Sequence, residues 1–89
     1  MINVFLLKEF GLRIKSLRVK NSWTQEDLAS ETGFHRTYIG MIERGERNIS
    51  FTHIGVFAGI FKMTVSQLVD FKEVNTKHSH KKYQNKREK

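Results

Sequence analysis

The 89-residue chain contains no cysteine and no proline, and it lacks any long hydrophobic run. Without cysteine the protein cannot form a disulfide, a thiolate metal site or a cysteine nucleophile, which fits a reducing compartment. No apolar stretch approaches the roughly 20 residues that a helix needs to cross a bilayer. The apolar start, MINVFLLKEF, has neither the basic segment nor the small-residue cleavage site of a signal peptide. We therefore expect a soluble cytoplasmic protein that does not bind a membrane.

Acidic residues are too few to balance the basic ones, and the imbalance lies mainly at the C-terminal end. The net charge is +7, of which residues 72–89 contribute +5 and residues 1–71 contribute +2. A basic protein of this kind usually binds a polyanion. Residues 72–89 show no apolar periodicity, so we predict a disordered basic tail there. Residues 1–71 are then the folded domain, which must identify the partner.

The apolar residues of this domain repeat with a helical period, and no alternating strand pattern occurs. A first helix is predicted near residues 4–20, and we expect Asn21 to end it because Asn tolerates a left-handed conformation. Four later sites repeat a hydrophobic staple, in which an apolar residue before the helix cap packs on one five positions later. They predict helices near 25–32, 36–43, 51–61 and 65–70. Two of them carry a capping-box partner, Asp27 after Thr24 and Gln67 after Thr64.

The predicted fold class is therefore all-α, with five helices around one apolar core. The expected core residues are Leu7, Phe10, Ile14, Leu17, Leu28, Ala29, Phe34, Ile39, Ile42, Ile54, Phe57, Ala58, Phe61 and Leu68.

The second and third predicted helices have the spacing of a helix-turn-helix. That motif needs a small residue where the helices cross, a turn residue that accepts positive φ, and an apolar residue pointing back at the first helix. Counted from Gln25, the residues Ala29, Gly33 and Ile39 occupy these positions. The combination is much more specific than any one of the residues.

The stretch WTQEDLASETGFHRTYIGMIERGERNISF resembles the helix-turn-helix of the phage-repressor and Cro-like (Xre-type) transcription regulators. The similarity covers roughly residues 8–70. Within that family, HRTYI..IERG.RNIS is most similar to the controller proteins of restriction–modification systems, which are small dimeric activators and repressors. The resemblance implies a phage-repressor-like fold and a sequence-specific regulator that binds a palindromic double-stranded DNA operator as a homodimer. RNA polymerase is a further candidate partner.

The N-terminal half of the motif's second helix is expected to read bases, as in other helix-turn-helix proteins. With Ile39 and Ile42 facing inward, a helical wheel points four residues outward: Thr37, Gly40, Met41 and Arg44. Arg can bond guanine bidentately and Thr can bond a base edge. We expect base reading by Arg36, Thr37, Tyr38 and Met41. For Tyr38 an equal alternative is that its ring covers the core while its hydroxyl reaches a phosphate, and Met41 is also a candidate packing residue.

Other residues are expected to hold the DNA backbone or the fold. The resemblance gives Gln25 a backbone contact at the start of its helix, and we add His35, Arg44, Arg47 and Asn48. It also implies a structural ion pair between Arg18 and Glu43. The expected dimer surface comprises Ile60, Val65, Val69 and Phe71, with Gly59 allowing the partner to approach. Lys62 departs from the family, which usually turns on glycine at that position.

No enzyme site, cofactor site or metal site is expected. His78 and His80 lie in the basic tail without a fixed third ligand, and His53 is expected to be exposed in the first turn of its helix. A phage-type or chromosomal repressor remains an alternative, as does an antitoxin whose main partner is a protein. A nonspecific nucleic-acid binder that uses the tail is a third alternative.

Overall fold

Five helices form the regular structure of residues 3–71, which are the residues that the computed structural model describes. They are α1 (Val4–Lys20), α2 (Gln25–Thr32), α3 (Arg36–Glu43), α4 (Phe51–Ile60) and α5 (Val65–Leu68). The all-α prediction is confirmed, and all five helices begin where the sequence places them. Helix α4 ends one residue earlier than expected and α5 two residues earlier. No helix in the described range is long and apolar enough to span a membrane.

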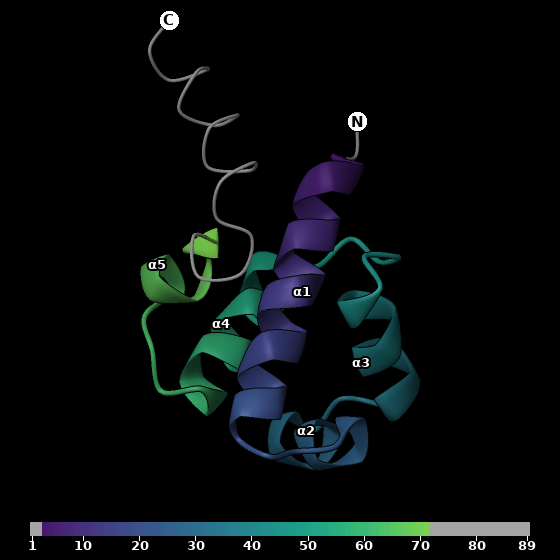
Figure 1. Cartoon of the computed structure of the whole chain (residues 1–89), viewed down its shortest axis with the longest axis vertical. Helices are drawn as coiled ribbons and strands as arrows, with labels where there is room; N and C mark the ends of the chain where they lie inside the picture. The colour runs from purple at the N-terminus through teal and green to yellow at the C-terminus, as the bar shows by residue number, and fades with distance from the viewer. Residues whose placement is uncertain (1–2, 72–89) are drawn as a thin grey trace, which may run out of the picture.

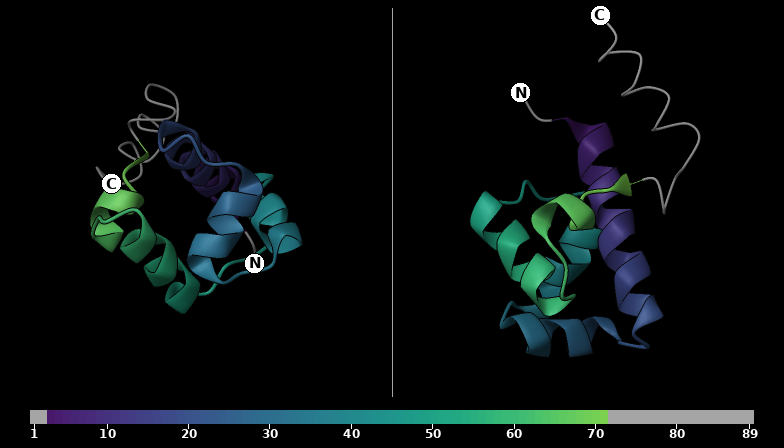
Figure 2. Two further views of the ribbon diagram at one scale, coloured as in Figure 1. Left: turned by 90° about the horizontal axis from the view of Figure 1, so that it is seen from below. Right: turned by 90° about the vertical axis from the view of Figure 1, so that its left-hand side faces the viewer.

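Helix α1 runs along the length of the molecule (Figure 1). Helix α3 lies on one side of it, and α4 and α5 lie on the other (Figure 1). Helix α2 crosses the end of the bundle, beneath α1 and α4 (Figure 2). This arrangement leaves α3 at the edge of the molecule, with one side against α1 and the other toward solvent.

Local hydrogen bonds at the helix ends explain why the elements start and stop where they do. The side chains of Thr24 and Thr64 cap α2 and α5, and both expected capping boxes are present. Each such cap is worth about 1 kcal/mol. Asn21 ends α1 as its C-cap, as expected, but not in a left-handed conformation: its φ is −89°, and the left-handed residue is Ser22, at φ 61°. Lys62 likewise adopts φ 58° without being glycine, at a cost of about 1 kcal/mol.

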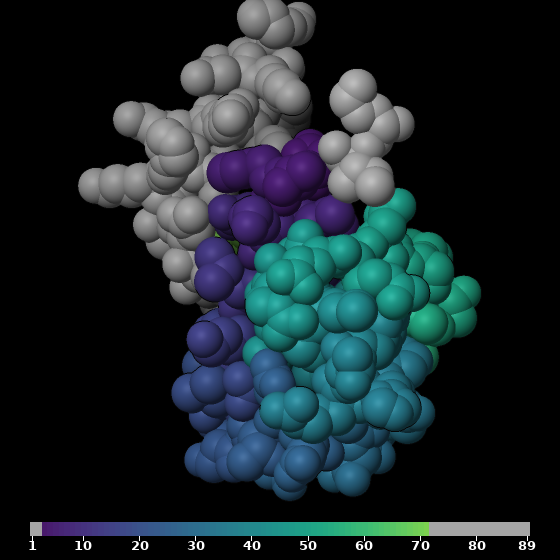
Figure 3. All heavy atoms as spheres, turned by 90° about the vertical axis from the view of Figure 1, so that its right-hand side faces the viewer, coloured from purple at the N-terminus to yellow at the C-terminus, as the bar shows by residue number. Residues whose placement is uncertain are grey.

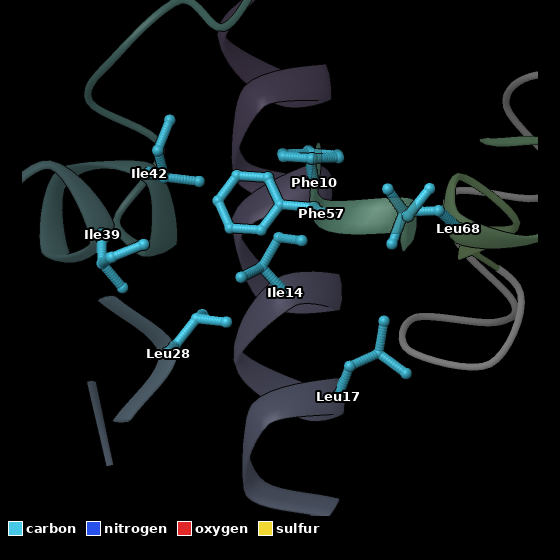
Figure 4. Close-up of a cluster of buried hydrophobic side chains, with 9 residues drawn as sticks. Phe10, Ile14, Leu17, Leu28, Ile39, Ile42, Phe57 and Leu68 are labelled. Carbon is cyan, nitrogen blue, oxygen red and sulfur yellow. The ribbon is translucent and has the colours of Figure 1, made fainter. Parts of the chain in front are cut away.

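The core is built where α1, α3 and α4 meet (Figure 4). Nine of the expected core residues are buried: Phe10, Ile14, Leu17, Leu28, Ile39, Ile42, Phe57, Ala58 and Leu68. Ala29, Phe34, Ile54 and Phe61 are partly buried and pack against this cluster. Leu7 is partly exposed and lines a surface groove instead.

Gly11 allows α1 and α3 to approach more closely than any side chain would permit. A Cβ atom built at this position would lie 2.5 Å from the backbone oxygens of both Ile42 and Glu43. Real Cβ atoms do not come so close to backbone, so a larger residue would push the last turn of α3 away from α1. The sequence analysis missed this requirement, because one glycine in a helix does not reveal what lies opposite.

Two charged residues of α1, Glu9 and Arg13, are buried on the side of the helix that packs against the rest of the domain. The Arg13 guanidinium donates hydrogen bonds from Nε to the Leu68 carbonyl and from Nη2 to the Gln67 carbonyl, each at 2.8 Å. A cation stabilises the C-terminal end of a helix because the carbonyls there carry partial negative charge. Arg13 thereby fastens the short helix α5 to α1. Apolar periodicity alone did not reveal this contact.

The ion pair that the resemblance implies between Arg18 and Glu43 is present and joins α1 to α3. Arg18 Nε lies 2.7 Å from Glu43 Oε2, and the two side chains are 11% and 3% exposed. Arg18 also donates to the Trp23 carbonyl at 2.8 Å. The Gln25 amide donates to Glu43 Oε1 at 3.0 Å. Glu43 therefore connects three helices, α1, α2 and α3.

We predict that Gly11→Ala lowers the free energy of unfolding by about 3 kcal/mol, since overpacking against backbone cannot be relieved by a rotamer change. The matched control is Gly55→Ala in α4, where a Cβ would meet nothing within 4 Å. At position 55, alanine should raise the free energy of unfolding by about 0.5–1 kcal/mol because its helix propensity is higher than that of glycine. Urea unfolding of both variants provides the measurement. Similar effects of the two substitutions would show that the close approach at Gly11 is not needed.

We further predict that Glu43→Gln lowers the free energy of unfolding by about 3–5 kcal/mol, because Arg18 would keep a buried charge without its counter-ion. Glu26→Gln is the control. Its carboxylate is 78% exposed and lies 4.0 Å from Arg36, so its removal should change stability by less than about 0.5 kcal/mol. Chemical denaturation of both variants tests this. A loss below about 1 kcal/mol for Glu43→Gln would contradict the structural role.

Candidate nucleic-acid interface

The turn between α2 and α3 is fixed by backbone conformation and by one hydroxyl. Gly33 adopts φ 81° and its N–H donates to the Ala29 carbonyl at 2.8 Å, which ends α2. The Thr32 hydroxyl donates to the Leu28 carbonyl at 2.9 Å and accepts from the Phe34 N–H at 3.1 Å. The spacing that predicted a helix-turn-helix therefore corresponds to two helices held in a defined relation.

Helix α3 has a buried side and an exposed N-terminal end. Ile39 and Ile42 are 0% and 2% exposed, whereas Arg36 and Thr37 lie at the surface. Tyr38 and Met41 are partly exposed. Of the four residues assigned to base reading, Arg36, Thr37 and Tyr38 thus lie in the first turn of α3, and Met41 lies in its second half.

The outward placement of Gly40 was wrong, because this residue is buried. A Cβ there would lie 3.1 Å from Nη1 of Arg44 and 3.8 Å from Oε1 of Gln25. The side chains from the next turn of α3 and from α2 thus cover the glycine. Its small size lets Arg44 and Gln25 lie across the helix, which a wheel without neighbouring helices could not show.

The side chains of His35 and Arg36, at the start of α3, make only weak polar contacts. His35 precedes the helix, and its Nδ1 accepts a 3.3 Å hydrogen bond from the Thr37 N–H. Arg36 Nε lies 4.0 Å from a carboxylate oxygen of Glu26, and the Arg36 side chain is 58% exposed. A pair this exposed contributes little to stability. The Arg36 guanidinium is therefore available to an external acceptor.

The segment after α3 carries further cations. Gly45 turns the chain at φ 72° and packs against Lys8, where a Cβ would lie 2.8 Å from the Lys8 Cγ. Arg44 Nε lies 3.0 Å from Glu46 Oε2. This hydrogen bond lowers the pKa of Glu46, and the charges of Arg44 and Lys8 act in the same direction. Glu46 therefore remains ionised, while the other N–H groups of the exposed Arg44 guanidinium stay available.

Arg47 lies over the Tyr38 ring, with its Cζ 5.2 Å from the ring centroid. Its Nη1 also approaches the Met41 sulfur at 3.8 Å. Asn48, which follows, is exposed. The residues expected to hold the DNA backbone therefore follow the expected base-reading residues across the same surface.

Gln25 occupies a different position from the other expected backbone contacts. Its side chain is partly buried, and its amide donates to Glu43. In this structure the amide therefore belongs to the ion-pair network rather than to the free surface. The first residue of α2 still offers its backbone N–H, since helix N-termini attract phosphates.

Figure 3 shows the face on which these groups lie. Helix α3 and residues 44–50 form the centre of the face, and α2 lies below them. The cations of this face are Arg36, Arg44 and Arg47, and all three are exposed. Because the major groove of B-DNA admits an α-helix, α3 with exposed arginines at its start and after its end is a candidate to enter it.

The sequence analysis missed one member of this region, His53, which it expected to be exposed. His53 is partly buried in the first turn of α4, and its Nδ1 lies 2.7 Å from the Tyr38 hydroxyl. The Phe34 ring packs on both partners, with centroid distances of 5.3 Å to Tyr38 and 4.5 Å to His53. Burial raises the pKa of Tyr38, and this outweighs the opposing effect of Arg47. Only the packing of α4 against the turn brings these residues together.

The expected dimer residues lie along the end of α4 and along α5. Ile60, Val65 and Phe71 pack partly against the core, and Val69 is 37% exposed. Val69 and Phe71 also line an apolar groove of about 640 Å³ together with Leu6, Leu7, Phe10, Asn48, Ile49 and Ile54. A Cβ at Gly59 would meet nothing within 4 Å, so this chain itself does not require a glycine there.

No group of three or more potential metal ligands occurs within residues 3–71. His78 and His80 lie outside the described residues, as does the whole basic tail 72–89.

Comparison with known proteins agrees with this geometry. The family model described as helix-turn-helix matches residues 14–68. Control protein C.BamHI of Bacillus amyloliquefaciens is 40% identical over 70 residues, which cover 78% of this chain and 84% of that protein. The crystal structure of the restriction–modification controller protein C.AhdI from Aeromonas hydrophila is 37% identical. It superposes with a TM-score of 0.66, over 70% of this chain and 94% of that one.

A second solved structure shows the C.Esp1396I controller protein as a tetramer with its natural 35-base-pair operator. It is 29% identical, with a TM-score of 0.63 over 73% of this chain and 95% of that one. The chain therefore belongs to the helix-turn-helix family and, within it, to the controller proteins of restriction–modification systems.

Proposed function

We propose that this protein is a sequence-specific regulator of transcription that binds a palindromic operator in double-stranded DNA as a homodimer. The observation that carries the proposal is the geometry of α3. Its N-terminal residues Arg36 and Thr37 are exposed, while Ile39 and Ile42 fix the opposite side of the helix in the core. A rigid helix with free polar side chains at its start can enter the major groove and contact base edges.

The residues around the start of α3 are proposed to make two kinds of contact, with bases and with the phosphate backbone. Arg36 and Thr37 would contact bases, with Met41 at the edge of that contact. Arg44, Arg47 and Asn48 would hold the phosphate backbone and set the register, as such contacts do in other complexes. The operator complex of C.Esp1396I supports DNA as the partner. We assign the protein to the control of a restriction–modification system, acting on promoters in the cytoplasm by blocking or contacting RNA polymerase.

Two copies are needed for useful specificity, because a single such helix reads only a few base pairs. Helix-turn-helix dimers bind half-sites about one helical turn apart, so the symmetry of the protein predicts the symmetry of the operator. Val69 and Phe71, with Ile60 and Val65 beside them, are the proposed contact between protomers. Helix α5 is on the other side of α1 from α3 (Figure 1), so a dimer formed there would leave the recognition helices free.

The proposal is tested by selecting bound DNA from a random duplex pool at about 150 mM salt, where nonspecific binding is weakened. We expect an enriched palindrome whose half-sites lie about one helical turn apart. A pool without enrichment would contradict sequence reading by α3. In that case either a protein partner, as for an antitoxin, or nonspecific binding through the tail would become the better explanation.

Two arginines should respond differently to truncation. We predict that Arg36→Ala weakens binding to the selected duplex by about 1–3 kcal/mol and relaxes the preference at one base, while Arg47→Ala weakens binding to every duplex alike. Titration of each variant with the selected duplex and with a random duplex of equal length makes the comparison. An equal loss on both duplexes for Arg36→Ala would show that Arg36 contacts the backbone instead.

A further inference from the structure

His53 has no role in the proposed DNA contacts, although it is hydrogen-bonded to Tyr38, which the sequence analysis expected to contact DNA. It lies in α4, outside the turn and the recognition helix. Its backbone is fixed by the Ser50 cap, whose hydroxyl accepts from the His53 N–H at 3.1 Å. Its ring is held between Phe34 and Tyr38, and Nδ1 lies 2.7 Å from the Tyr38 hydroxyl. A short hydrogen bond between two held rings leaves the Tyr38 oxygen little freedom of position.

The direction of this hydrogen bond depends on where His53 carries its proton. A tyrosine hydroxyl has a single proton to donate. When Nδ1 is unprotonated, the Tyr38 O–H donates to it, and the oxygen presents only lone pairs to the exterior. When Nδ1 carries a proton, as it always does in the imidazolium form, it donates to the Tyr38 oxygen, and the tyrosine proton is released for another acceptor.

The charges around the pair determine which acceptor suits that proton. The titratable and charged members of this cluster are Tyr38 on α3, His53 on α4 and Arg47, which lies over the Tyr38 ring. None of them is acidic. The positive charge of Arg47, over the Tyr38 ring, favours an anion as the group that meets the tyrosine hydroxyl. A DNA phosphate is such an anion, and it accepts hydrogen bonds but cannot donate them.

We propose that His53 is a positioning residue that sets the direction of the Tyr38 hydrogen bond, so that a proton on Nδ1 releases the tyrosine proton for a phosphate of bound DNA. This inference rests on the proposed function and deepens it. It assigns Tyr38 to the backbone rather than to a base edge. It also makes the affinity for DNA depend on whether His53 Nδ1 carries a proton, so the affinity should rise as the pH falls from about 8 to about 5. Since burial raises the pKa of Tyr38, the phenol itself remains protonated throughout that range.

The test compares affinities at about pH 5.5 and pH 8, measured by fluorescence anisotropy with the full chain. The duplexes are the one enriched in the selection and a random duplex of equal length. The informative variant is Tyr38→Phe, which keeps every histidine and the aromatic packing but removes the hydroxyl. If protonated histidines acted only through their charge, this variant would keep the pH dependence of the unaltered protein.

We expect the ratio of affinities at the two pH values to be roughly fivefold larger for the unaltered protein than for Tyr38→Phe, on both duplexes. The effect is limited because a neutral imidazole can also place its proton on Nδ1. His53→Asn keeps a hydrogen-bonding group in the side chain but cannot titrate. The ratio of affinities at the two pH values should be no larger for His53→Asn than for Tyr38→Phe. The double variant should show the same ratio as His53→Asn alone.

Equal pH ratios for the unaltered protein and Tyr38→Phe would overturn the inference while leaving the proposed function intact. A pH effect confined to the enriched duplex would overturn the assignment to phosphate, because phosphates are present in both duplexes. Failure of the unaltered protein to prefer the enriched duplex at either pH would instead refute the proposed function, and the inference would fall with it. Thermal unfolding of each variant verifies that the compared proteins are folded.

Discussion

The contact between α1 and α3 is the constraint on which the rest of this structure depends. It has a steric part at Gly11, where the backbone of α3 fills the space of a missing side chain. It also has an electrostatic part, in which Arg18 of α1 holds Glu43 in the last turn of α3. Both parts act at the C-terminal end of α3, so the helix is anchored at one end and exposed at the other. A recognition helix needs this arrangement, because contact with base edges requires a free N-terminus on a fixed axis.

The charges of the candidate interface illustrate how acidic groups can serve a DNA-binding surface. Glu43 is buried and joins three helices, so its charge acts inside the fold rather than toward the DNA. Glu46 is exposed and bonded to Arg44, so it lies beside a proposed phosphate contact. A pair this exposed contributes little to stability.

The aromatic cluster extends the candidate site beyond the helix-turn-helix. Phe34 comes from the turn, Tyr38 from α3 and His53 from α4, so three elements determine where one hydroxyl lies. Arg47, which lies over the Tyr38 ring, belongs to the segment that connects α3 to α4, so this segment also contacts the cluster. The candidate DNA-binding surface is thereby coupled to the packing of α4. A substitution in the core that moves α4 would therefore also move the Tyr38 hydroxyl at the edge of the candidate interface.

The sequence by itself determined the helices and the family. Staples, capping boxes and the positions of Ala29, Gly33 and Ile39 are local patterns, and local hydrogen bonds and helical periodicity suffice to interpret them. Only the tertiary structure decided what lies opposite each residue. It revealed the backbone contact at Gly11, the bonds from Arg13 to α5, the burial of Gly40 and the partner of His53. Each of these depends on a neighbour that is distant along the chain or on another helix, and the period of a single helix carries no information about that neighbour.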